Sequence, residues 1–224
     1  MIAPGGGTTL GAMISELLLT SLVGFAIVGS VTPGPNNLMV MASGAAFGWR
    51  ATLPHIMGIM VGFAVMNAAM GLGLGSLLAG VPALVWVVKT GGALWLLWLA
   101  FQLARAAIRP ADPARSRSVG RPMRFHEAVL FQWVNPKAWA MALAAAGAYA
   151  QLTPSLWGRT ALIVLILALC SPLANGVWVT MGEALHHLLS GARAGRIFGL
   201  LMAALLAATA VSIFLASPEI ASPA

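Results

Sequence analysis

The side chains of this sequence that could do chemistry gather in two short segments, and each segment interrupts an apolar stretch. Segment 32–37 reads TPGPNN, and segment 135–137 reads NPK. Proline has no amide hydrogen and strains the preceding turn, so carbonyl groups before each break lose their helical partners. Where a helix restarts, its free amide groups and positive partial charge favour binding of a carboxylate. The predicted chemistry is therefore non-covalent recognition of a small acid.

The asparagines and the lysine of these segments have structural as well as functional interpretations. Asn36 and Asn37 open the first restarted helix, where asparagine side chains cap free amide groups. Lys137 opens the second, about nine residues inside its apolar stretch, so its ammonium group lies deep unless the side chain snorkels. The alternatives are a kink with capping asparagines that contact no ligand, and a lysine that only positions its helix.

The composition indicates that lipid surrounds the elements that hold these segments. Of the residues, 60% are hydrophobic and 8% are charged, whereas soluble domains carry about 25% charged residues. Six apolar stretches are long enough to cross a bilayer, and the first and fourth contain the two breaks. The stretches are Ile14–Val31 with a continuation Asn36–Phe47, Leu53–Leu74, Ala83–Leu103, Ala128–Ala150, Thr160–Gly182 and Ile197–Leu215.

The arginines predict how these spans are oriented. Six of them lie between the third and fourth spans, and if that loop is cytoplasmic, alternation adds Arg50, Arg193 and Arg196 to the same side and leaves Arg159 opposite. Both termini are then outside. Because this distribution accounts for the formal net charge of +7, we expect a lipid bilayer as the partner and no nucleic acid.

The two breaks stand at similar places in two halves of three spans each. A repeated unit with an odd number of spans inserts in opposite orientations, which produces an inverted repeat with its site near the bilayer midplane. We therefore expect an all-α membrane protein of six transmembrane helices, arranged as a 3+3 inverted repeat with broken first and fourth spans. Its expected parts are a flexible tail 1–13, a first repeat 14–103, an Arg-rich cytoplasmic loop 104–127, a second repeat 128–215 and a C-terminal tail 216–224.

Ionic coupling is harder to place, because every carboxylate falls at a span end or in a loop and none at the midplane. Proton-coupled transporters commonly use buried acids. A desolvated lysine is then the remaining candidate, and burial would lower its pKa. Asn67 and Asn175 are deep polar side chains that either join helices or line a cavity. The candidates for coupling or gating are Lys137, Lys89, Glu127 and Asn67, with snorkelling and a plain surface position as the alternatives for Lys89 and Glu127.

Two other classes of protein are alternatives at this stage: an intramembrane enzyme, and a channel or cation transporter. The sequence has no paired midmembrane aspartates, no HExxH pattern and no serine with a histidine in one span. The single cysteine, Cys170, excludes a disulfide framework or a thiolate metal cluster. We therefore predict no catalytic residue, no metal site, no cofactor and no enzymatic activity, and the lack of buried acids disfavours a cation pathway.

The segment Thr32–Asn37, with Leu38-Met39-Val40 and Gly48-Trp49-Arg50 after it, resembles the signature of the LysE/RhtB amino-acid exporters. Segment Lys89–Ala100 resembles the third span of that family and Asn135–Ala138 its fourth, so the resemblance extends from about Leu17 to Phe214. The double asparagine, segment Phe131–Asn135 and segment Ala174–Trp178 are most similar to the cysteine and O-acetylserine exporters within it.

The resemblance implies efflux of an amino acid or derivative across the bacterial inner membrane, driven by the proton-motive force. Threonine, homoserine, leucine and lysine are further substrates in the family, and a homo-oligomer is left open. We expect both restarted helices to face one cavity, where amide groups and Lys137 bind the carboxylate while the two repeats rock. The expected substrate-binding residues are Thr32, Pro33, Gly34, Pro35, Asn36, Asn37, Asn135, Pro136, Lys137 and Asn175.

Overall fold

The computed structural model describes residues 6–75, 77, 81–108, 121–188 and 192–215, and all regular structure within these ranges is helical. Residues 1–5 of the expected N-terminal tail, the expected C-terminal tail 216–224 and half of the expected Arg-rich loop, residues 109–120, lie outside the described residues. Helix α1 begins inside the segment for which the sequence predicts a flexible tail. The elements are α1 (Gly6–Val31), α2 (Pro35–Ala69), the π-helix η1 (Met70–Leu74), α4 (Pro82–Ile108), α5 (Phe125–Phe131), the 3-10 helix η2 (Gln132–Val134), α6 (Pro136–Ala148), α7 (Leu156–Leu188) and α8 (Ala192–Leu215).

Within the described ranges, five helical segments are long and apolar enough to cross a membrane, so the chain is a multi-pass membrane protein. They are Met13–Val31, Pro35–Leu74, Thr90–Ile108, Leu156–Leu185 and Arg193–Ser212. The sequence predicts six spans. The difference is the predicted fourth span, which the structure divides into α5, η2 and α6, and each of these pieces is too short to cross a bilayer alone.

Helix α2 contains a sharp turn at Gly48 and is two helices in space. Gly48 has φ 79° and ψ 176°, a backbone region that is essentially restricted to glycine. The side chains of Ser43 and Thr52 hydrogen-bond across the turn at 2.8 Å, although nine residues of continuous helix would separate them by about 13 Å along the axis. The Glu183 carboxylate accepts a hydrogen bond from the Trp49 amide at 3.1 Å and so caps the second helix.

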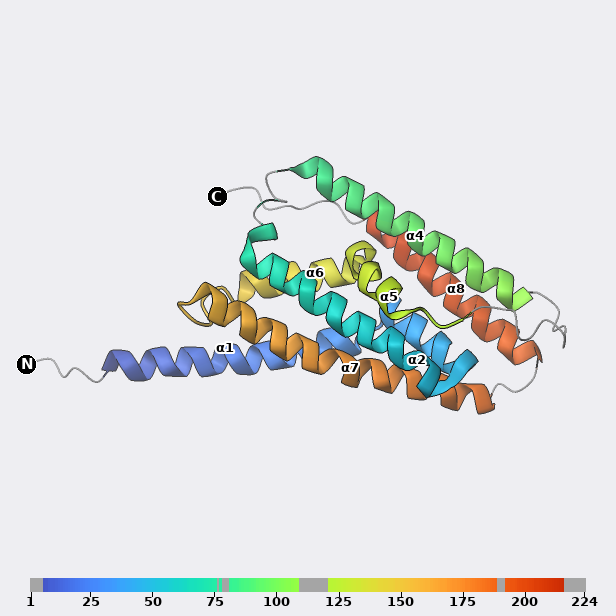
Figure 1. Ribbon diagram of the computed structural model, residues 1–224, viewed down its shortest axis with the longest axis horizontal. Helices are drawn as coiled ribbons and strands as arrows, with labels where there is room; N and C mark the ends of the chain where they lie inside the picture. Colours follow the sequence, from blue (N-terminus) through green and yellow to red (C-terminus); the bar gives the residue numbers. More distant parts are fainter. Residues whose placement is uncertain (1–5, 76, 78–80, 109–120, 189–191, 216–224) are drawn as a thin grey trace, which may run out of the picture.

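The helices pack as two groups whose long axes run in similar directions (Figure 1). Helix α7 lies against α1 and α2, and α4 pairs with α8 on the other side of the bundle. Close approach depends on glycine: a Cβ atom at Gly182 of α7 would lie 2.0 Å from the Met41 carbonyl oxygen of α2. Such backbone contacts replace the missing hydrophobic driving force between helices in lipid.

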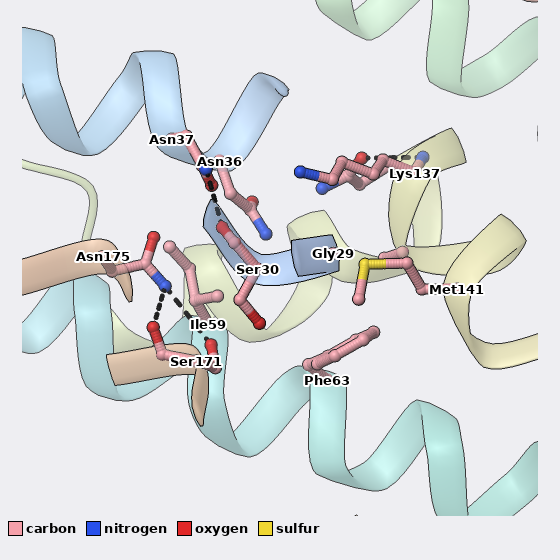
Figure 2. Close-up of a pocket in the computed structure, with 12 residues that line it drawn as sticks. Gly29, Ser30, Asn36, Asn37, Ile59, Phe63, Lys137, Met141, Ser171 and Asn175 are labelled. Carbon is pink, nitrogen blue, oxygen red and sulfur yellow. Dashed lines mark hydrogen bonds between the residues drawn. The ribbon is translucent and has the colours of Figure 1, made fainter. Parts of the chain in front are cut away.

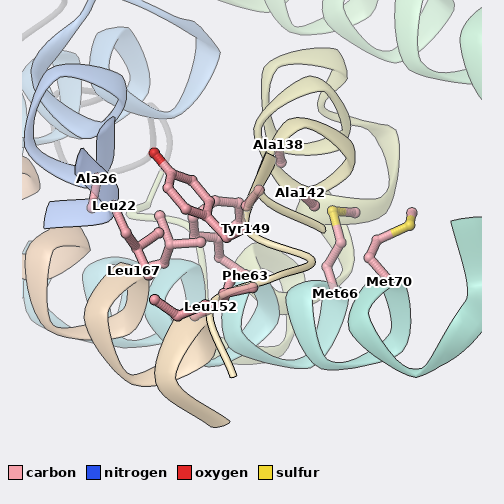
Figure 3. Packing of buried hydrophobic residues seen from close by; sticks show 12 residues of the cluster. Leu22, Ala26, Phe63, Met66, Met70, Ala138, Ala142, Tyr149, Leu152 and Leu167 are labelled. Atoms are coloured by element: carbon pink, nitrogen blue, oxygen red, sulfur yellow. The ribbon is translucent and has the colours of Figure 1, made fainter. Parts of the chain in front are cut away.

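Three clusters of buried apolar residues lie among the described residues, and two of them include buried residues of both α2 and α7. The larger one joins α1, α2, α6 and α7 around Tyr149, whose hydroxyl is 3.3 Å from that of Ser21 (Figure 3). The other is built on Ile56 and Ile59 of α2, with Ala128 of α5 and Val179 of α7.

Candidate functional site

The carbonyl groups at the end of α1 are bonded by side chains from three different helices. The Asn37 amide donates to the Ser30 carbonyl at 2.8 Å and to that of Thr32 at 3.0 Å. The Trp178 indole of α7 donates to the Val31 carbonyl at 3.2 Å, and the Lys137 ammonium donates to the Thr32 carbonyl. The break therefore leaves polar groups that the surrounding protein satisfies, as a lipid environment requires.

This arrangement corrects the predicted role of the two asparagines as caps. The N-cap residue of α2 is Gly34, without a side-chain cap. Asn36 and Asn37 follow Pro35 inside the first helical turn, so their side chains reach away from the free amide groups. Asn37 bonds the end of α1 instead, and Asn36 forms a reciprocal amide pair with Gln132, at 2.9 Å and 3.3 Å.

At the second break, α5 ends in the 3-10 turn η2 and the chain restarts as α6 at Pro136. Asn135 is the N-cap residue, and its side chain accepts a hydrogen bond from the Lys137 amide at 3.1 Å. The half-buried Lys137 side chain crosses to the first break. Gly34 makes room for it, since a Cβ atom at Gly34 would lie 2.5 Å from Lys137 Cδ.

The two breaks meet at a small cavity between α1, α2, α6 and α7. Figure 2 shows Asn36, Asn37 and Lys137 on one side and Asn175 on the other. The cavity has a volume of about 30 Å³, which is room for about two water molecules at 10–15 Å³ each. We call this small cavity the contracted state of the site. Its lining is Gly29, Ser30, Asn36, Asn37, Ile59, Phe63, Asn135, Lys137, Ala138, Met141, Ser171 and Asn175.

One buried polar atom of this lining has no partner among the described residues. The Asn175 amide nitrogen donates to the Ser171 carbonyl at 2.8 Å and lies 3.2 Å from the Ser171 hydroxyl. Its carbonyl oxygen has no hydrogen bond, although the residue is 4% exposed. An unsatisfied buried acceptor is costly, and in a cavity wall it is a site for a ligand's N–H group.

The structure brings some expected site residues to the cavity and leaves others away from it. Asn36, Asn37, Asn135, Lys137 and Asn175 line it. Thr32 contributes its carbonyl and Gly34 makes space, but these two residues do not line the cavity, nor do Pro33, Pro35 and Pro136.

Of the remaining coupling candidates, Asn67 and Glu127 do not line the cavity. Asn67 is buried in α2 and donates to the Phe63 carbonyl at 2.8 Å. Lys89 is on α4, and its side chain lies outside the described ones. Glu127 is at the start of α5, outside the membrane-spanning segments, where the hydrogen bond from Arg121 lowers its pKa to about 2.

Sequence reasoning missed several residues of the site. Gln132 is completely buried and pairs with Asn36; its polar side chain three residues before the second break was the available signal. Ser171 lies one helical turn before Asn175, so its position on the same face could have been inferred. Met141 and Phe63 carry no such signal, because apolar residues in an apolar helix look alike.

A model of the LysE type translocator family matches residues 27–217. The chain is 27% identical over 202 residues to the cysteine/O-acetylserine efflux protein of Salmonella typhimurium, and this covers 90% of the chain and 100% of that protein. It is 25% identical over 203 residues to the cysteine/O-acetylserine efflux protein of Escherichia coli strain K12, with the same coverage. No solved structure matches the chain significantly.

Proposed function

This chain belongs to the LysE type translocator family, and we propose that it is a secondary active transporter that exports small amino acids or their derivatives from the bacterial cytoplasm. Cysteine and O-acetylserine are the first substrates to test, because the relatives at 25–27% identity are named for them. Threonine and homoserine come next, from the wider family. The observation that carries the proposal is the cavity where two broken helices meet.

The cavity suits a zwitterion because its lining presents both a cationic donor and hydrogen-bond acceptors. The starts of α2 and α6 carry positive partial charge, and Lys137 adds a full charge, so the substrate carboxylate is placed there. The end of α1 carries negative partial charge, and the Asn175 oxygen is an acceptor without a partner. The substrate ammonium group is placed between these acceptors.

The transport cycle that we propose uses six spans in two inverted halves, with Ala128–Ala150, which includes the end of α5, η2 and α6, as the fourth span. The halves rock about the cavity and open it alternately to either side. The contracted cavity expands when the apolar cluster around Tyr149 or the one around Ile56 opens. The proton-motive force drives export, the arginine-rich end faces the cytoplasm and both termini face outward.

Export is tested by expressing the chain in a bacterial strain and measuring amino acids in the medium, with and without an uncoupler. We expect cysteine, O-acetylserine or a similar small amino acid to accumulate outside, and the uncoupler to stop it. Accumulation of no amino acid from a correctly inserted protein, with each candidate supplied in excess, would falsify the proposal.

A matched pair of variants tests the substrate site. Asn175→Leu removes the acceptor from the cavity wall, and Asn67→Leu removes a similar buried amide outside the cavity. Both lose one hydrogen bond to a carbonyl four residues earlier in their helix. We expect export to stop in Asn175→Leu and to persist in Asn67→Leu. Equal loss in both variants at equal membrane levels would show that the amide has a structural role only.

A further inference from the structure

His55 is a buried titratable residue that the substrate site does not use. It lies in the second half of α2 and is 1% exposed. Neither ring nitrogen has a hydrogen-bond partner among the described residues. Packing alone does not require a histidine here, because an unpartnered buried polar group costs free energy that an apolar residue of similar size avoids.

The residue stands at one end of a tight seam between α2 and α5. Three residues after His55, a Cβ atom at Gly58 would lie 2.3 Å from the Phe125 carbonyl oxygen of α5. One turn further, a Cβ atom at Gly62 would lie 2.7 Å from the Val129 carbonyl oxygen and 2.8 Å from Gln132 Cγ. The backbones of α2 and α5 therefore meet without intervening side chains from α2, a contact that can separate as one unit.

The seam connects His55 to the cavity. Ile59, one helical turn after His55, lines the cavity. Gln132 at the far end of the seam holds Asn36, another lining residue. Separation of α5 from α2 would therefore open the cavity towards this end of the bundle and expose the His55 ring to water in the same movement.

Charged and titratable groups surround this end of α2. On α5, the Glu127 carboxylate is bonded to the Arg121 guanidinium and the Arg124 amide. On α7, Glu183 is bonded to the Trp49 amide. The other described groups of these helices at this end are Arg50 of α2 and the exposed Arg124 and His126 of α5.

We infer that His55 is the proton-binding residue that couples the seam between α2 and α5 to transport, an inference that rests on the proposed export function. With the seam closed, a charged imidazole would be buried without a partner, so the seam closes on the neutral ring. A proton that reaches the ring through the cavity, while the cavity is open to the other side, charges the buried ring and so favours separation of the seam. With the seam open, the hydrated ring releases this proton to the arginine-rich end, and the seam closes again on the neutral ring.

The test uses purified protein in liposomes and two assays. Counterflow exchanges labelled for unlabelled cysteine or O-acetylserine without a pH gradient, and the second assay measures accumulation driven by an imposed gradient. We expect His55→Gln to keep counterflow and to lose gradient-driven accumulation. His126→Gln, which changes an exposed histidine on α5, should match the wild type in both assays. Absence of counterflow in the wild type refutes the export function itself.

Two results with the variants overturn the role of His55 while leaving export intact. One is gradient-driven accumulation by His55→Gln at the wild-type rate. The other is loss of counterflow in both His55→Gln and His55→Phe, which indicates a structural role. A third measurement uses the wild type. Diethyl pyrocarbonate should modify His55 during counterflow and should leave it unmodified when substrate is absent. Mass spectrometry measures the modification, with His126 as the internal reference. Protection of His55 during counterflow also overturns the inference.

Discussion

Replacement of Lys137 by methionine removes the ammonium group from the cavity while keeping a side chain of similar length. In the structure this ammonium group donates to the Thr32 carbonyl. An ammonium group has three donors, so it can keep that bond and still bind a carboxylate. The Lys137→Met variant therefore loses the full free energy of the bond to the substrate carboxylate, and not only the difference between that bond and the bond to the Thr32 carbonyl.

The expected loss follows from the kind of bond. A hydrogen bond to a charged group contributes about 1.5–3 kcal/mol, and each 1.4 kcal/mol changes a dissociation constant about tenfold. Substrate affinity should therefore fall roughly 10- to 150-fold. The variant also leaves the Thr32 carbonyl without its partner, so the break between α1 and α2 loses some stability of its own.

The assay is binding of the exported amino acid to protein in nanodiscs, with thermal unfolding measured on the same samples. Arg159→Met is the matched control, because Arg159 also donates a charged N–H group to a backbone carbonyl, that of Ala150 at 2.9 Å, and lies outside the cavity. It should bind like the wild type. An affinity of Lys137→Met equal to that of this control would refute a role for the ammonium group in binding.

The remaining predictions concern packing and pH. Gly182→Ala places a Cβ atom 2.0 Å from the Met41 carbonyl oxygen and should lower the free energy of unfolding by about 1–3 kcal/mol. Gly24→Ala is the control, because its Cβ atom meets no atom within 4 Å, and it should leave stability unchanged. Unfolding in detergent measures both variants, and equal stabilities would contradict the packing argument. The lowered pKa of Glu127 means that its pairing with Arg121 stabilises the fold above the ordinary pKa of 4.5 and ceases to do so as the pH falls towards 2. Wild-type protein should therefore lose more stability than Glu127→Gln on acidification from pH 5, and parallel pH profiles would contradict this.

The position of both helix breaks could be predicted from the sequence, because proline acts locally on the turn before it. The partners of the exposed carbonyl groups could not be predicted, because they come from distant segments: Asn37 across the break, Lys137 from α6 and Trp178 from α7. The predicted capping role of Asn36 and Asn37 was wrong for the same reason. Residue type indicates that an amide will be bonded, and only the packing of helices selects the partner.

The turn at Gly48 and the burial of His55 also depend on contacts between helices that are distant in sequence. The sequence predicts a boundary between two spans at residues 48–52, but it does not predict that the single residue Gly48 makes the turn within continuous helix, because glycine is frequent in membrane helices and the turn also depends on Glu183 of α7. His55 lies in an apolar stretch where its burial follows from the approach of α5 along Gly58 and Gly62.

The sequence by itself determined that the chain is a helical membrane protein with two broken segments, because hydrophobicity and proline act over a few residues. It also carried the resemblance to the amino-acid exporters that the family match confirms. The sequence predicts one cavity where the two breaks meet, but the tertiary structure alone decided which side chains line it and that the Asn175 oxygen there has no partner among the described residues. These features depend on contacts between helices, which no local pattern encodes.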